Sequence, residues 1–231
     1  MRALRILLIT AVILGGLFAI ADRLAVNYAE SEAADRIRAR QGVPSGSTDV
    51  SIQGFPFLTQ VMGKELDEVG VTLTGIEATA GDRKVRIAEL TADLHDVRLE
   101  DNFSKATAAT ATGTARISYA DLGTASGEDV TVGHGGKGKV KVTGSIQVPV
   151  FGSITRSVLS TVSIVDGDTL RVRADAVPGE DIPGVEERVR ARTDFDRKIG
   201  GLPAGLKLQK AEATAEGLVI TLTGTNVVVA G

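Results

Sequence analysis

Few side chains in this chain could carry out chemistry. Its 231 residues include no cysteine and only two histidines, His95 and His134. Without cysteine, the chain can form no disulfide, thiolate nucleophile or cysteine-ligated zinc site. His95 occupies a polar position of an alternating run, and His134 lies in a glycine-rich stretch. Both are therefore predicted to be solvated side chains and not metal ligands.

The glycine-rich stretch 133–139 matches part of the phosphate-binding loop pattern. Gly133, Gly138 and Lys139 occupy its glycine and lysine positions, but Val140 follows where the pattern requires Ser or Thr. An alternating strand pattern then replaces the expected helix, so no helix N-terminus is available to hold a phosphate. The stretch therefore predicts a hairpin turn.

Other catalytic and ligand-binding motifs are also missing from the sequence. No Gly-x-Ser-x-Gly motif occurs. After Asp166-Gly167-Asp168, the later ligand positions of a calcium loop hold basic or apolar residues. With a formal net charge of −3, the chain has no excess of Lys and Arg to bind nucleic acid. We therefore predict a protein that is not an enzyme, uses no cofactor and binds no nucleic acid.

The elements that would position any site begin with an apolar N-terminal segment. Arg2 and Arg5 precede residues 6–21, which contain no charge, and a small-x-small tripeptide ends at Ala21. This pattern is typical of a secretory signal peptide cleaved before Asp22. A tilted membrane anchor is the alternative, because the run is short for a membrane span. Either reading predicts that residues 1–21 direct export and that the remaining chain lies at the extracytoplasmic face of the membrane.

Residues 22–231 are predicted to form a single α+β domain. Small apolar residues recur at spacings of three and four through residues 22–40, which predicts a helix that packs closely on a sheet. Alternating apolar residues after Pro44 predict many antiparallel strands, with a second, charged helix starting near Pro183. A change of alternation between Ile87 and Leu90 predicts a β-bulge that bends the sheet. A flat β-sandwich is the alternative.

The segment 54–60 reads Gly-Phe-Pro-Phe-Leu-Thr-Gln. Pro56 cannot donate a ladder hydrogen bond, so the segment is predicted to turn, with Gln60 fixing the turn through backbone hydrogen bonds. Phe55, Phe57 and Leu58 surround the turn with large apolar groups. They could form an apolar lip, at a groove entrance or against a membrane, or both rings could be ordinary core, and the sequence leaves both readings open.

Four segments together resemble the LmeA-like proteins of the actinobacterial cell envelope. They are the apolar segment that runs into the helix from Asp22, residues 54–60, Leu202-Pro203 with Gly205-Leu206, and the terminal strand from Gly217. Ala204 stands where the family more often has an aromatic residue. The resemblance implies a fold similar to the tubular lipid-binding proteins, in which a long N-terminal helix packs on a strongly curved antiparallel β-sheet and encloses an apolar groove. It also implies phospholipid binding and a part in building mannose-containing envelope lipids, and it brings no catalytic residues.

The apolar strand faces agree with that implication, because the two predicted helices cannot cover them all. An acyl chain in a groove would gain about 0.8 kcal/mol per buried methylene. We therefore predict an exported, membrane-associated lipid-binding protein, acting as a carrier or lipid-presenting module, with a phospholipid or other acyl-chain lipid and the membrane as its partners. A non-catalytic structural envelope protein with a filled β core is the alternative. The predicted groove or lip residues are Phe55, Pro56, Phe57, Leu58, Val148, Val150, Leu202 and Leu206.

Overall fold

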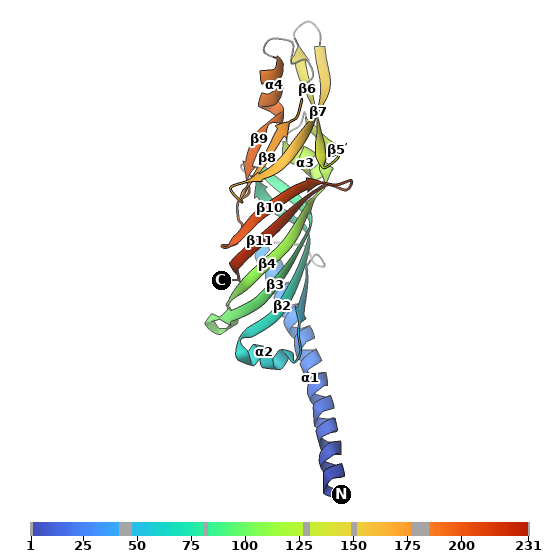
Figure 1. Cartoon of the computed structure of the whole chain (residues 1–231), viewed down its shortest axis with the longest axis vertical. Coiled ribbons are helices and arrows are strands. Elements are labelled where there is room, and N and C mark those ends of the chain that lie inside the picture. The colour runs from blue at the N-terminus through green and yellow to red at the C-terminus, as the bar shows by residue number, and fades with distance from the viewer. Residues whose placement is uncertain are drawn as a thin grey trace.

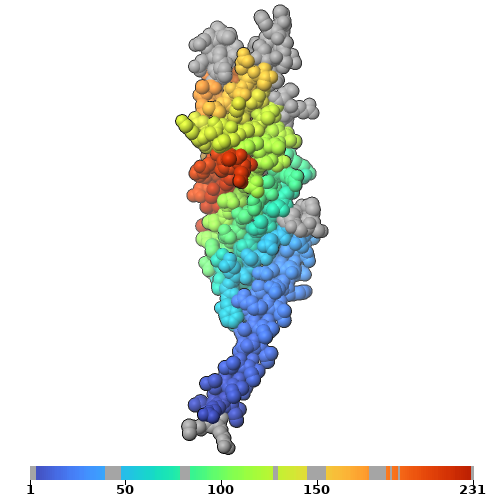
Figure 2. All heavy atoms as spheres, turned by 90° about the vertical axis from the view of Figure 1, so that its right-hand side faces the viewer, coloured from blue at the N-terminus to red at the C-terminus, as the bar shows by residue number. Residues whose placement is uncertain are grey.

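The computed structural model describes residues 2–41, 48–80, 83–126, 130–148, 152–176 and 185–230. The molecule is elongated, with two antiparallel sheets arranged along its long axis and a helix projecting from one end (Figure 1). This helix, α1 (Arg2–Gln41), runs without a break through the apolar segment and the amphipathic one. Its N-terminal part extends from the body as a narrow stalk (Figure 2).

The larger sheet lies beside α1 and contains six strands in the order β1-β2-β3-β4-β11-β10. The strands are β1 (Thr48–Gln53), β2 (Glu65–Ala80), β3 (Arg83–Glu100), β4 (Lys105–Ile117), β10 (Leu206–Ala213) and β11 (Leu218–Ala230). A short helix, α2 (Phe57–Gly63), and a 3-10 turn, η1 (Asp101–Phe103), lie at the end of this sheet from which α1 projects (Figure 1).

The second sheet lies at the other end of the molecule, with five strands in the order β5-β6-β7-β8-β9. Its strands are β5 (Val130–Gly136), β6 (Lys139–Val148), β7 (Gly152–Val165), β8 (Thr169–Ala174) and β9 (Phe195–Lys198). Two further helices are α3 (Tyr119–Ser126) and α4 (Val185–Thr193). The sheets meet through α3, which packs on both β3 and β5, and through β10, which packs on β7.

The predicted α+β class, with a long N-terminal helix and antiparallel strands, is confirmed. The strands form two sheets where one was expected, and in the described residues neither sheet closes into a barrel. The predicted turn is present at residues 54–56, whereas residues 57–60 form the start of the unpredicted α2. The Gln60 side chain holds this turn as expected, because its Nε2 donates to the Gln53 carbonyl at 3.4 Å and its Oε1 accepts from the Asp67 amide at 2.9 Å.

Side chains of α1 form hydrogen bonds with backbone groups at the exposed edge of the larger sheet. Glu30 Oε1 accepts a hydrogen bond from the Ile52 amide at 2.8 Å, and Arg38 Nη2 donates to the Thr48 carbonyl at 2.9 Å. Both partners belong to β1, the edge strand, whose free backbone groups would otherwise remain unpaired. The polar face of α1 therefore attaches the helix along this edge.

The long strands change the parity of their apolar side chains where the sheet bends. Leu94 and Val97 of β3 are three residues apart, yet both are buried in the same apolar cluster. The intervening Asp96 has a positive φ of 50° and makes no ladder pair with β2 or β4. Asn226 of β11, also at φ 50°, occupies the same level of the sheet. Asp and Asn tolerate this conformation better than most residues, so they allow each strand to turn its apolar side inward again.

A second parity change lies between Ile87 and Leu90, where the sequence predicted a bulge. Both residues line the same cavity, so the change of face is real. The β2–β3 pairing nevertheless keeps its register, because β2 changes parity at the same level through Gly75, whose φ is 67°. The change of face is therefore as predicted, but the predicted β-bulge is wrong, because both strands change face together without a register shift.

Candidate functional site

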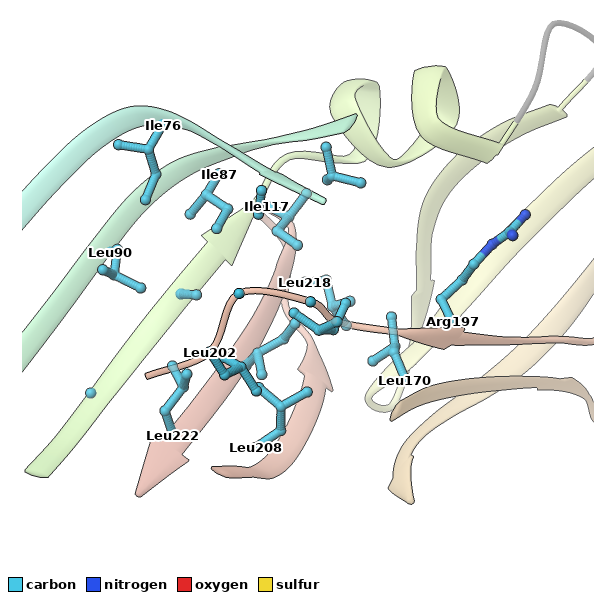
Figure 3. Close-up of a pocket in the computed structure, with 18 of the residues that line it drawn as sticks. Ile76, Ile87, Leu90, Ile117, Leu170, Arg197, Leu202, Leu208, Leu218 and Leu222 are labelled. Carbon is cyan, nitrogen blue, oxygen red and sulfur yellow. The ribbon is translucent and has the colours of Figure 1, made fainter. Parts of the chain in front are cut away.

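A cavity of about 910 Å³ lies along the inner faces of the two sheets (Figure 3). Such a volume is near the upper end of the range for small-molecule sites. Large aliphatic side chains from both sheets form most of its wall. They include Ile76, Ile87, Leu90, Ile117, Leu170, Leu208, Leu218 and Leu222, and Leu202 from the loop after β9 joins them.

Small side chains at the centre of the larger sheet leave room for the cavity. The Ala- and Thr-rich stretch 106–115 forms most of β4. Ala111, Gly113 and Ala115 of this strand line the cavity, as does Ala92 of the neighbouring β3. Because each side chain is short, the sheet wall is recessed at this level while the bulkier residues around it complete the lining.

Charged groups are rare in the cavity wall. In the described part of the chain, its charged lining residues are Glu77, Asp194 and Arg197. Glu77 accepts a hydrogen bond from Lys84 at 2.8 Å, which lowers the pKa of this exposed carboxyl. Asp194 Oδ1 accepts from the Ala174 amide at 2.8 Å, so this carboxylate is held by the backbone of β8. The wall thus supplies a long apolar surface with few polar positions.

Two of the predicted site residues, Leu202 and Leu206, line this cavity. Leu202 belongs to the loop after β9, and Leu206 begins β10. The side chain of Val148, at the end of β6, and the whole of Val150 lie outside the described residues. These two predictions therefore stay untested.

The four residues from the turn lie elsewhere, immediately before α2 and in its first turn, where α2 packs on α1. Phe57 is 5% exposed and packs in the cluster that contains Val26 of α1 and Leu66 of β2. Phe55 is 57% exposed, with the Arg23 guanidinium 5.3 Å from its ring centre. Pro56 and Leu58, the remaining two, are half-buried beside them. The two rings therefore have different environments, one in the core and one at the surface.

A buried carboxylate connects this turn to α1. Asp22 is fully buried, and its Oδ1 accepts a hydrogen bond from the Leu58 amide at 2.8 Å. That amide lies in the first turn of α2, where backbone N–H groups lack helical partners. Asp22 is also the residue predicted to follow the signal peptide, so the predicted boundary falls where α1 meets the body.

The histidines lie outside the cavity wall. His134 is exposed, with Nδ1 3.3 Å from the Tyr119 hydroxyl, and half-exposed His95 is 4.0 Å from Glu68. The stretch 133–139 forms the predicted hairpin between β5 and β6. Among the described residues, no group of three His, Cys, Asp or Glu side chains could hold a metal ion.

The sequence predictions missed Arg197 and most of the lining. The aliphatic lining residues were recognised as strand positions, but their common cavity depends on how the two sheets face each other. Arg197 was overlooked because β9 lies in the segment after Pro183, where the sequence predicted a charged helix and no strand. The alternation of Phe195, Arg197 and Ile199, all of which line the cavity, is the signal that could have revealed this strand.

The N-terminal helix meets the criteria for a membrane span. The described residues contain one helix long and apolar enough, with a mean hydropathy of 2.4 in its most apolar stretch and none of that stretch buried. Secretory signal sequences meet the same criteria, so the finding fits a signal or an anchor.

A projecting apolar helix joined to an open β fold with a large apolar cavity defines a class of protein that shields an apolar ligand from water. Comparison with known families agrees with this class. The LmeA-like phospholipid-binding family matches residues 20–223, and the chain belongs to this family. The family is a lipid-binding one and not an enzyme family. No curated protein and no solved structure matches the chain.

Proposed function

We propose that the protein binds the acyl chains of a phospholipid in the cavity, at the extracytoplasmic face of the membrane to which α1 directs it. There it acts as a carrier or lipid-presenting module in the assembly of envelope lipids. The observation that carries the proposal is the apolar cavity of about 910 Å³. Membership of a phospholipid-binding family supports the choice of ligand.

The cavity favours lipid binding over the alternative of a structural protein with a filled β core. Packed protein interiors contain few voids larger than a water molecule. An apolar cavity of this size instead has a wall that is stabilised when the apolar atoms of a ligand cover it. Each methylene that enters would contribute about 0.8 kcal/mol, so acyl chains could bind firmly with few polar contacts.

The end of the body next to the apolar stalk supports membrane association. Phe55, Met62 and Phe103 are large, apolar and exposed, at 57%, 84% and 46%. Phe55 precedes α2, Met62 lies on α2, and Phe103 lies on η1. The Leu99 amide, two residues before η1, donates to the carbonyl of Lys64 at the C-terminal end of α2 at 2.9 Å. Because the stalk leaves the body at this end (Figure 1), we propose that these three residues contact the membrane in which the stalk lies.

Lipid occupancy tests the cavity. The full chain, purified in detergent, is extracted and its lipid is measured by mass spectrometry. Ala92→Phe would project a ring into the cavity and should lower the amount of bound phospholipid. Ala109→Phe is the matched control, because Ala109 is exposed on the neighbouring β4. Absence of phospholipid from the unaltered protein, or equal lipid in both variants, would contradict the proposal.

A single-tryptophan experiment tests the membrane-facing end. The chain has no Trp, so Phe55→Trp introduces one reporter. In phosphatidylcholine–phosphatidylglycerol vesicles with brominated acyl chains, its fluorescence should be quenched. Leu159→Trp is the control, because Leu159 is 43% exposed on the distant second sheet. Equal quenching at both positions, or none at Phe55→Trp, would exclude the proposed contact.

A further inference from the structure

One basic side chain lines the cavity in the described part of the chain. This residue is Arg197, in the middle of β9. It pairs with Leu170 of β8, and Phe195 pairs with Val172. Leu170 and Val172 are buried and also line the cavity. Because residues at alternate positions share a face of a sheet, Phe195 and Arg197 belong to the inner face of β9.

Arg197 has no carboxylate partner among the described residues. The acidic groups around it are bound elsewhere. Asp196 pairs with Arg171 at 2.8 Å and with Arg173 at 2.9 Å, and Asp168 pairs with Lys198 at 3.0 Å. Asp194, which also lines the cavity, accepts from the backbone of β8 and lies 3.6 Å from Arg190.

The Arg197 guanidinium lies over the Phe195 ring, 5.7 Å from the ring centre. Arg197 is half-buried. A cation that is partly removed from water and has no anion beside it keeps an unmet preference for one. A guanidinium is also the side chain best suited to phosphate, because its planar donors can bind two oxygens at once.

The position of Arg197 within the cavity matches the shape of a lipid. In Figure 3 its side chain extends from β9 away from the cluster around Leu202 and Leu218, while Leu90 and Ile76 lie on the far side of that cluster. The lining also includes Ile37 of α1. The cavity thus combines a long apolar wall with one cation, which is the chemistry of an amphiphile with acyl chains and an anionic group.

We propose that Arg197 binds the phosphate of the lipid whose acyl chains occupy the cavity. This inference rests on the proposed lipid-binding function and adds the recognised group to it. The ligand class is therefore a phosphate-bearing lipid. A neutral lipid with the same acyl chains gains no binding affinity from Arg197.

Comparison of two lipids tests the assignment. The full chain in detergent, stripped of bound lipid, is titrated with phosphatidylglycerol and with diacylglycerol that carry the same fluorescent acyl chain. The unaltered protein should prefer phosphatidylglycerol. Arg197→Gln should weaken phosphatidylglycerol binding roughly 10- to 100-fold, the range that charge-assisted hydrogen bonds produce, and leave diacylglycerol binding unchanged. Arg197→Lys should recover part of the loss.

Arg156→Gln is the matched control, because Arg156 is exposed on β7 of the same sheet and the change in charge is identical. It should bind both lipids as the unaltered protein does. Thermal unfolding checks that each variant is folded. Unchanged phosphatidylglycerol affinity in Arg197→Gln, or an equal loss in Arg156→Gln, would overturn the assignment. Failure of the unaltered protein to bind either lipid would instead refute the proposed function itself.

Discussion

The two phenylalanines of the turn provide a sharp test. The same substitution should lower the stability of the fold strongly at Phe57 and only slightly at Phe55. Phe57 is 5% exposed and packs between α1 and the larger sheet, whereas Phe55 is 57% exposed. We predict that Phe57→Ala destabilises the fold and leaves the exposed apolar surface intact. Phe55→Ala should leave the fold nearly as stable and should weaken only the proposed contact with the membrane.

The expected magnitudes follow from burial. A Phe side chain removes about 150–250 Å² from water, and about 25 cal/mol per Å² makes this worth roughly 4–6 kcal/mol. Ala retains part of that contact, so Phe57→Ala should lower the free energy of unfolding by about 3–5 kcal/mol. For a chain of this size, the melting temperature should fall by about 6–20 °C. Phe55→Ala loses an exposed cation–π contact with Arg23, worth about 0.5–1 kcal/mol, or less than about 4 °C.

Thermal unfolding of the full chain in detergent, followed by far-ultraviolet circular dichroism, measures both variants. The β signal reports the body, where the two sheets lie. A fall in melting temperature that is equal for the two variants would refute the placement of Phe57 in the core and Phe55 at the surface. A larger fall for Phe55→Ala would refute it more strongly.

Three further predictions concern groups outside the cavity. The double variant in which Gln replaces both His95 and His134 should change stability by no more than about 0.5 kcal/mol and leave lipid binding unchanged. A loss of stability or of lipid binding would reveal a site that the fold does not indicate. A C-terminal reporter that is active only outside the cytoplasm should be active on the full chain, and a mature N-terminus at Asp22 would identify a cleaved signal. Hydrogen bonding from Arg171 lowers the pKa of Asp196, so this carboxylate stabilises the fold at neutral pH and loses that effect below about pH 4. The difference in melting temperature between the unaltered protein and Asp196→Asn should therefore shrink on acidification, and an unchanged difference would argue against it.

Features set by neighbouring residues could be predicted from the sequence. The helix that ends at Gln41 follows from its apolar spacing and the Gly and Pro after it. The hairpin at residues 133–139 follows from glycines between two alternating runs. In both cases the local pattern and the final structure agree because the stabilising contacts are close in sequence.

Features that depend on distant pairing could not be predicted in this way. β9 contains four residues and follows a charged helix, and its pairing with β8 stabilises it. The register at Ile87 and Leu90 depends on Gly75 in the partner strand. The burial of Phe57 depends on Val26 of α1, which lies much earlier in the sequence and approaches only in the folded chain. The cavity itself depends on the spacing of two sheets, which no strand pattern specifies.

The positions of α1 and Arg197 together predict how a lipid would lie in the protein. The second sheet, with β9, is at the end of the body away from the apolar stalk (Figure 1). Ile37, which also lines the cavity, belongs to α1, the helix that forms the stalk and runs beside the larger sheet. With its phosphate at Arg197, a bound phospholipid would direct its acyl chains toward α1 and its headgroup away from the membrane. This orientation favours a module that presents the headgroup to a partner in the envelope.

Two labelled lipids can distinguish the orientations. A fluorophore on the headgroup of protein-bound phosphatidylglycerol should be quenched readily by aqueous iodide, because that end lies beside the half-buried Arg197. A fluorophore at the end of the acyl chain should be protected, because it lies deep in the apolar wall. In Arg197→Gln, the difference between the two labels should shrink as the lipid loses its fixed direction. Strong quenching of the acyl label together with protection of the headgroup label would reverse the orientation and favour a protein that draws lipids in headgroup first.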